Sequence, residues 1–231
     1  MENLPLYVPV IFVITVLAAL YIFYKAADHS KGFLGLAIAW IVLQTIVSLM
    51  GFYAVQTKPP RFILLTLPPV LFAIIYSSTR SGKAFLSKIN LKVLTLIHTL
   101  RIPAELVLFW LFVYHAVPQA MTFEGRNFDI FSGLSAPLIY YFGFVKKTLG
   151  RQIIIIWNFI CLGLLVNVLI IGASSAIKRL PMDGAVKTGV AVQYFPFVLL
   201  PGFLVIIILY SHVVSIGRLL RMGFKPDSAD Y

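Results

Sequence analysis

Seven stretches of apolar residues run along the chain, and the short segments between them hold most of its charges. A membrane-spanning helix needs about 20 mostly apolar residues, with about 17–25 tolerated. The stretches therefore predict seven transmembrane helices, at approximately 5–24, 33–55, 62–78, 92–118, 130–145, 152–176 and 190–217. The third and fifth are short, so six spans with one re-entrant segment are the alternative.

Composition places the chain in the class of membrane proteins. It is 60% hydrophobic and only 12% charged, whereas soluble domains are usually about 25% charged. We therefore expect an all-α, polytopic integral membrane protein whose single transmembrane domain covers residues 1–231. No stretch is suited to a separate soluble domain.

The distribution of Lys and Arg predicts how the helices are oriented. Twelve of these residues lie on one side of the predicted bundle and six on the other, while Arg101 lies within the fourth stretch. Because cytoplasmic loops carry the excess of Lys and Arg, the N-terminus is expected outside and the C-terminus inside. The plasma (inner) membrane is the expected location, and 219–231 is expected to be a flexible cytoplasmic tail.

The net charge of +11 suggests an acidic binding partner. The basic residues flank apolar stretches in small groups and do not line one polar face, so nucleic acid is not indicated. The lipid bilayer is the expected partner, with anionic headgroups on the cytoplasmic face. Residues 77–92 form a basic inner segment that is expected to carry a short amphipathic helix.

The fourth stretch carries three ionisable side chains, His98, Arg101 and Glu105. Their i, i+3, i+7 spacing puts all three on one helix face. Counted from Lys92 at about 1.5 Å per residue, they lie about 9, 13 and 20 Å deep. Arg101 and Glu105 are four residues apart, close enough to pair, and Pro103 between them predicts a kink.

Two other helices carry polar side chains at matching depth. His212 precedes the anchor Arg218 by six residues, just as His98 follows Lys92 by six, and Asn158 follows Arg151 by seven. Ionisable residues inside a membrane are functional candidates by default, although buried His and Asn also serve as links between helices. The candidate ligand-binding or proton-coupling residues are His98, Arg101, Glu105, Asn158 and His212.

A second group of polar residues lies in the outer loop that leads into the fifth stretch. Its members are Glu124, Arg126, Asn127 and Asp129. Phe123 and Phe128 alternate with them and suggest a loop that folds onto the bundle, although a solvated turn would have a similar composition. Asp129 precedes the fifth helix and is expected to cap its N-terminus.

Sequence motifs for a cofactor are absent. A single cysteine, Cys161, excludes an intrachain disulfide and a cysteine-based metal cluster. No metal site or resident cofactor is predicted. The alternative that stays open is a b-type haem held between His98 and His212.

Three classes of function fit these features. The preferred one is a transporter or channel for a small molecule or ion, with the His98–Arg101–Glu105 face as its site. In this hypothesis Arg101 attracts an anion or holds Glu105 ionised, and Glu105 or His98 carries a coupling proton. The alternatives are a redox protein with haem or quinone and a membrane-embedded enzyme acting on a lipid, so enzymatic activity stays open.

Overall fold

The structure, a computed structural model, describes residues 4–55, 57, 61, 63–178 and 191–221, and these residues form helices and turns without a β-strand. The first half of the chain contains α1 (Tyr7–Ala26), α2 (Lys31–Leu49), η1 (Phe52–Ala54), α3 (Ile63–Ser78) and α4 (Arg80–Lys88). The middle contains α5 (Leu91–Leu96), η2 (Ile97–Leu100), α6 (Arg101–Val113) and η3 (Gln119–Met121). The remainder contains α7 (Ile130–Ile139), η4 (Tyr140–Val145), α8 (Arg151–Lys178), η5 (Ala191–Gln193), η6 (Leu200–Leu204) and α9 (Val205–Arg221).

Among the described residues, five helical segments are long and apolar enough to cross a membrane: Tyr7–Ala26, Lys31–Leu49, Leu91–Val113, Arg151–Ser175 and Leu200–Arg221. A sixth candidate is the pair α3 and α4, whose axes meet at 94°. The apolar segment Ile130–Val145 is shorter. The all-helical prediction is confirmed at this level, with five to six apolar helices of spanning length.

Polar and apolar residues are distributed as expected for a protein in lipid. Large aliphatic side chains such as Ile14, Ile74 and Ile160 are 58–60% exposed, while Arg101, Glu105 and His98 are at most 3% exposed. In water this arrangement would be costly, because the exposed apolar side chains would contact solvent. Large exposed apolar patches are accordingly rare on soluble monomers. The structure therefore supports membrane insertion independently of helix length.

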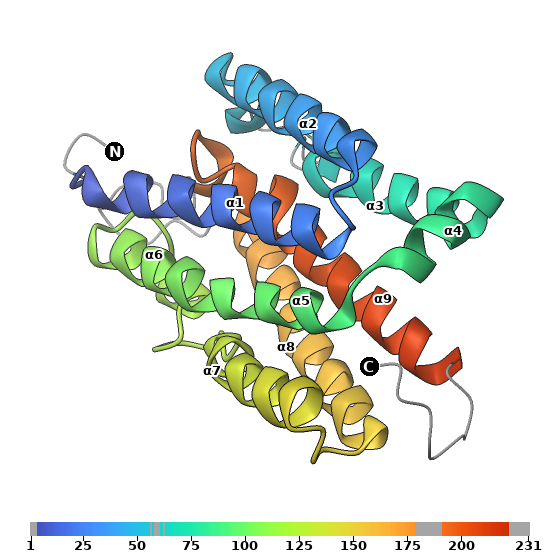
Figure 1. The fold of residues 1–231 in the computed structure, drawn as a ribbon. Helices are drawn as coiled ribbons and strands as arrows, with labels where there is room; N and C mark the ends of the chain where they lie inside the picture. Colours follow the sequence, from blue (N-terminus) through green and yellow to red (C-terminus); the bar gives the residue numbers. More distant parts are fainter. Residues whose placement is uncertain (1–3, 56, 58–60, 62, 179–190, 222–231) are drawn as a thin grey trace.

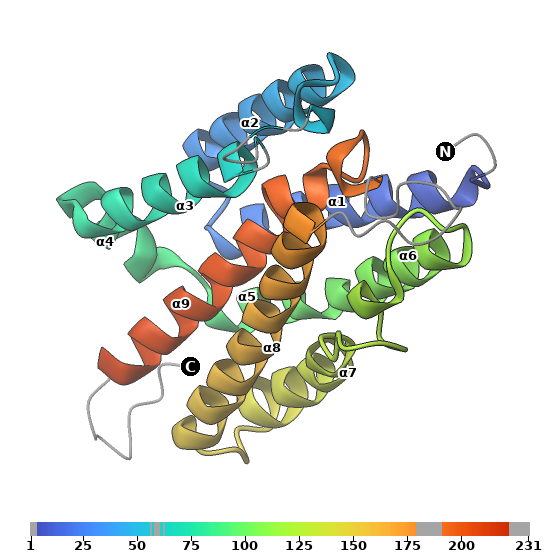
Figure 2. The same ribbon diagram turned by 180° about the vertical axis from the view of Figure 1, so that it is seen from behind.

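The continuous rod of α5, η2 and α6 lies between α1 on one side and α7 on the other, as Figure 1 shows. From behind, α8 and α9 cross this layer and pack against each other (Figure 2). α2 contacts α1 and η6, while α3 contacts η6 and α9. Among the described residues, the buried charged side chains are those of Arg101 and Glu105 on the rod and of Asp129 just before α7.

Local sequence explains several helix ends. Ser30, Thr79 and Asn90 cap α2, α4 and α5, each accepting a hydrogen bond from the backbone N–H three residues later. α2 ends before Gly51, which has a φ of 72° and therefore adopts the left-handed conformation that favours glycine. The α4 helix lies within the basic segment 77–92, where the sequence predicts a short helix.

Helix α9 overlaps the start of the predicted flexible tail, 219–231. It continues to Arg221, and Leu219 is fully buried. In the last turn Leu219 packs into the bundle, whereas Leu220 is 59% exposed. The rest of the predicted tail, 222–231, lies outside the described residues.

Candidate functional site

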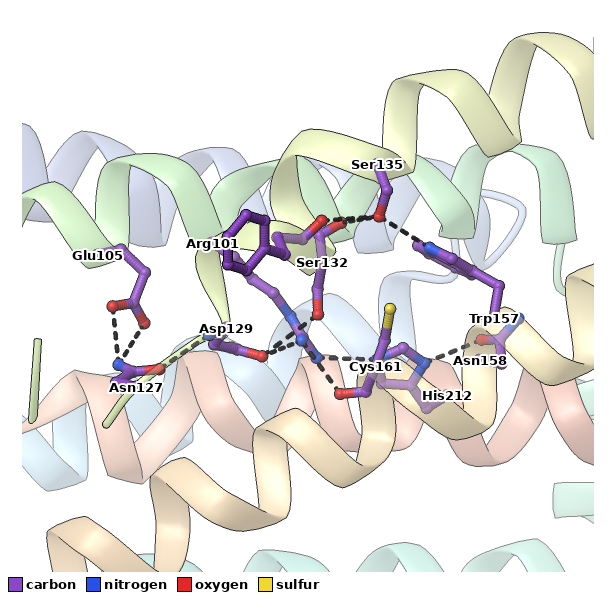
Figure 3. A network of polar contacts seen from close by, with 11 residues as sticks. Arg101, Glu105, Asn127, Asp129, Ser132, Ser135, Trp157, Asn158, Cys161 and His212 are labelled. Carbon is purple, nitrogen blue, oxygen red and sulfur yellow. Dashed lines mark hydrogen bonds and ion pairs between the residues drawn. The ribbon is translucent and has the colours of Figure 1, made fainter. Parts of the chain in front are cut away.

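Arg101 is the centre of a buried polar network that joins three helices and one loop (Figure 3). Its side chain is 1% exposed, and its Nη1 forms an ion pair with Asp129. Nη1 also donates to the backbone carbonyl of Cys161 on α8 at 3.3 Å, and Nη2 lies 2.8 Å from Nε2 of His212 on α9. The guanidinium therefore ties α6 to α8, to α9 and to the loop before α7 through one side chain.

The hydrogen bonds of His212 define its tautomer. A guanidinium can only donate, so Nε2 of His212 accepts from Arg101. Nδ1 must then carry the proton, which it donates to Oδ1 of Asn158 at 2.9 Å. Nδ2 of Asn158 donates in turn to the carbonyl of Ile154 at 2.9 Å. His212 is thus the neutral Nδ1–H imidazole, and both of its nitrogens are occupied.

Glu105 forms the other end of the network. Nδ2 of Asn127 lies 2.7 Å from each of its carboxylate oxygens and also donates to the carbonyl of Met121 at 2.9 Å. The backbone N–H of Asp129 donates to Oδ1 of Asn127 at 3.0 Å. A continuous series of polar contacts therefore runs from Glu105 through Asn127, Asp129, Arg101 and His212 to Asn158.

The loop of residues 114–129 brings Asn127 and Asp129 into the bundle. Phe123 stacks on Phe109 of α6 with ring centroids 5.1 Å apart, and Asn167 of α8 donates to the carbonyl of Arg126 at 2.7 Å. At Gly125 a Cβ would lie 2.3 Å from the carbonyl oxygen of Gln119, so only glycine fits this turn. The loop is re-entrant, because it leaves the end of α6 and returns to the level of Arg101.

Two predictions about the partners of charged side chains need correction. Arg101 pairs with Asp129 and not with Glu105, although Glu105 is only four residues away on the same helix. Asp129 occupies the position before α7 but does not cap it, because its carboxylate points at Arg101. Tertiary packing supplies a partner for each charged group that helical spacing could not reveal.

The candidate residues predicted from the sequence divide into those inside the polar network and those outside it. His98, Arg101, Asn158 and His212 meet at one level, and Glu105 is linked to them through the loop. Glu124 and the side chain of Arg126 are exposed and take no part in the network. Ser132 of α7 has no feature in the sequence that indicates a role here, yet its hydroxyl donates to the Asp129 carboxylate at 3.4 Å.

His98 differs from the other members of the network. Its ring is fully buried and stacks on His212 with centroids 4.0 Å apart and planes at 23°. The ring of Trp157 packs against that of His98 in a T-shaped arrangement, with ring centroids 5.4 Å apart and planes at 80°. Neither ring nitrogen has a hydrogen-bond partner among the described residues. A buried imidazole with two unpaired nitrogens is rare, because it loses its hydrogen bonds to water without replacement.

The histidine geometry does not fit a haem held between His98 and His212. Axial ligands point a ring nitrogen at the iron from opposite faces of the porphyrin. Here the two rings stack face to face, which leaves no space for a porphyrin between them, and both nitrogens of His212 are hydrogen-bonded. Among the described residues, no group of three or more His, Cys, Asp or Glu could hold a metal ion.

Backbone geometry brings the network together at two points. Pro103 has no N–H, and the turn before it tightens into η2, where the Arg101 N–H reaches back to the carbonyls of His98 and Thr99. Gly133 lets α7 approach closely, since a Cβ there would lie 2.8 Å from Cγ1 of Ile102 and 3.1 Å from its backbone nitrogen.

Gly133→Ala is expected to destabilise the protein by about 1–3 kcal/mol through overpacking. The added methyl group would force α7 away from Arg101. The unfolding midpoint can be followed with a thiol-reactive dye, because the chain has one cysteine and Cys161 is 2% exposed. Gly163→Ala is the matched control on α8, where a Cβ meets nothing within 4 Å. Equal midpoints for the two variants would show that close packing at Gly133 is unimportant.

Comparison with known proteins gives a family for this site but no function. No curated protein and no solved structure matches the chain. One family, described as a domain of unknown function (DUF8737), matches residues 59–220, which include every member of the polar network. The chain belongs to the DUF8737 family.

Proposed function

We propose that this protein is a transporter or channel for a small solute or ion, and that Glu105 carries the proton that moves with it. The proposal places it in the plasma (inner) membrane with seven crossings, the N-terminus outside and the C-terminus inside. The excess of Lys and Arg on the inner side supports this orientation. Anionic headgroups on the cytoplasmic face are its proposed lipid partners.

The short fifth segment is compatible with seven crossings. Gly133 lies against Ile102, and the Tyr140 ring lies 5.4 Å from the Lys92 ammonium, so α7 descends along the inner half of the α5–α6 rod. The re-entrant loop occupies the other half. The fifth crossing in this proposal consists of a loop in the outer half and a helix in the inner half, which is tolerated where the loop is buried in protein.

The observation that carries the proposal is the charge balance of the network. Asp129 neutralises Arg101, whereas the hydrogen-bond partner of Glu105 is the neutral amide of Asn127. An ionised carboxylate buried without a cation is expensive in a membrane. Glu105 is therefore suited to bind and release a proton. Arg101 is less suited to attract an anion, as the sequence hypothesis allowed, because Asp129 already occupies it.

Irregular helices around the network supply candidate moving parts. η2 is a 3₁₀ turn, whereas η4 and η6 are π-helical; Pro201 lies within η6, Pro103 lies in the first turn of α6 after η2, and Pro137 lies in the last turn of α7 before η4. π-Helical turns occur frequently at functional sites, and interrupted helices frame the binding sites of many transporters. η2 continues into α6, which carries Arg101, and η6 continues into α9, which carries His212. η4 extends α7, which begins directly after Asp129.

Proton uptake by reconstituted vesicles tests the proposal. Vesicles containing the pH-sensitive dye pyranine are given an inside-negative potential with valinomycin and a potassium gradient. We expect faster acidification than in protein-free vesicles, either in buffer or after addition of amino acids, sugars or carboxylic acids. Dicyclohexylcarbodiimide, which reacts with protonated carboxyl groups in apolar surroundings, should block this flux and label Glu105.

Asp129 is the internal control for the labelling, because its pairing with Arg101 keeps it ionised and unreactive. Labelling of Glu105 should decrease as the pH is raised, since only the protonated acid reacts. Acidification no faster than in protein-free vesicles under every condition would overturn the proposal. Labelling of Asp129 in preference to Glu105 would overturn the charge assignment on which it rests.

A further inference from the structure

A separate pocket lies on the opposite side of α1 from the α6–α7 contact, between α2, η1 and the start of α3. Its volume is about 500 Å³, within the range of about 300–1,000 Å³ that is usual for small-molecule sites. Leu43, Val47 and Leu64 contribute apolar walls, and Trp40 and Tyr53 contribute aromatic ones. None of these residues belongs to the polar network.

The polar groups inside the pocket already have protein partners. The Tyr53 hydroxyl lies 2.5 Å from Oε1 of Gln44, and Nε1 of Trp40 donates to the carbonyl of Gly202 in η6 at 2.7 Å. Their hydrogen bonds are directed into the protein. The interior of the pocket therefore offers a mainly apolar surface to a ligand.

Arg61 provides a positive charge in the same lining. Its guanidinium lies 4.6 Å from the centroid of the Phe52 ring, and Nη1 is 3.4 Å from the Phe52 carbonyl. Within the described part of the chain no carboxylate forms an ion pair with it. A guanidinium has five N–H donors in a planar fork that matches a phosphate, so most of its donor capacity lies outside these two contacts.

The pocket opens sideways, towards the lipid-facing surface. Leu43 and Leu64 are each 49% exposed, and Met50 is 79% exposed, although all three line the pocket. Leu43 and Leu64 lie on α2 and α3, whose exposed faces also carry large apolar side chains such as Leu36, Val42, Leu67 and Leu71. An acyl chain could enter from the bilayer without crossing a polar surface.

We propose that this pocket binds a membrane phospholipid with an anionic headgroup, such as phosphatidylglycerol. One acyl chain lies along Val47 and Leu64 under Trp40, and the headgroup phosphate lies on Arg61. In the proposed orientation this site belongs to the outer leaflet, since it lies at the connection between α2 and α3. It is distinct from the basic cytoplasmic face, and it does not depend on transport through Glu105.

Tryptophan quenching by brominated lipids tests the site directly. The protein is reconstituted into vesicles with dibrominated phosphatidylglycerol or dibrominated phosphatidylcholine, and the quenching lost in Trp40→Phe is assigned to Trp40. A single favourable charge near the surface predicts an approximately fivefold preference for the anionic lipid. Arg61→Gln should abolish this preference, and Val47→Phe, which fills the pocket, should reduce quenching of Trp40 by both lipids.

Arg126→Gln is the matched control, because this exposed arginine lies outside the pocket in the loop between α6 and α7. It should retain the full preference of the wild-type protein. Equal quenching of Trp40 by the two lipids in the wild-type protein would overturn the proposal. A preference that persists in Arg61→Gln, or is lost equally in Arg126→Gln, would also overturn it, because the selectivity would then come from general surface charge.

Discussion

Replacing Asp129 with alanine is expected to destabilise the protein by about 3–5 kcal/mol, because removing one partner of a buried ion pair leaves the other charge uncompensated. Arg101 is 1% exposed, and among the described residues no second carboxylate forms an ion pair with it. Its remaining partners, the Cys161 carbonyl and His212, are neutral. The unfolding midpoint measured through the Cys161 thiol should fall accordingly.

Two further variants make this result specific. Glu124→Ala removes an exposed acid from the same loop and should leave the midpoint almost unchanged. Arg101→Met combined with Asp129→Leu removes both charges and should recover much of the stability, because apolar replacements of a buried pair are often neutral or stabilising. If Asp129→Ala behaves like Glu124→Ala, the ion pair does not hold the bundle together.

Glu105→Gln is expected to reduce proton flux to the level of protein-free vesicles and to eliminate carbodiimide labelling. The glutamine side chain has nearly the same shape, and its carbonyl oxygen can accept from Nδ2 of Asn127, so the loop should stay in place. What is lost is the capacity to exchange a proton. Flux and labelling are compared with the wild-type protein at equal amounts of reconstituted protein.

Glu124→Gln, on the exposed part of the loop, is the control for this measurement and should leave flux unchanged. An unchanged unfolding midpoint in Glu105→Gln would confirm that a loss of flux is not a loss of fold. Wild-type flux in Glu105→Gln would show that the proton moves by another route, and the network would then be structural.

Helical spacing and depth predicted much of the network but not its pairing. The spacing of His98, Arg101 and Glu105 identified one face of one helix, and counting from basic anchors put Asn158 and His212 at a matching level. These inferences need only the rise and periodicity of a helix. The side chains that the anchors placed together are in contact in the structure.

The choice of partners depends on residues that are distant in sequence. Asp129 is 28 residues from Arg101, and Asn127 is 22 residues from Glu105. Only the path of the loop decides that these pairs form in preference to an Arg101–Glu105 pair. The short fifth apolar stretch was the available signal, because a helix too short to cross requires chain from elsewhere to occupy the remaining depth.

The lipid pocket had no comparable signal in the sequence. Trp40, Gln44 and Tyr53 read as ordinary residues of an apolar helix and its end. In the structure Nε1 of Trp40 donates to the carbonyl of Gly202 in the π-helical segment Leu200–Leu204, 162 residues away in sequence. Helical periodicity within α2 contains no information about this contact with a distant segment.

The re-entrant loop has a consequence for how this protein could open. Because Asn127 and Asp129 lie two residues apart, withdrawing the loop from α6 would uncover Glu105 and Arg101 in the same movement. Each uncovered group costs free energy unless water or a proton satisfies it. The loop therefore couples the two ends of the network: an opening that lets water reach the Glu105 carboxyl group would also break the Arg101–Asp129 ion pair.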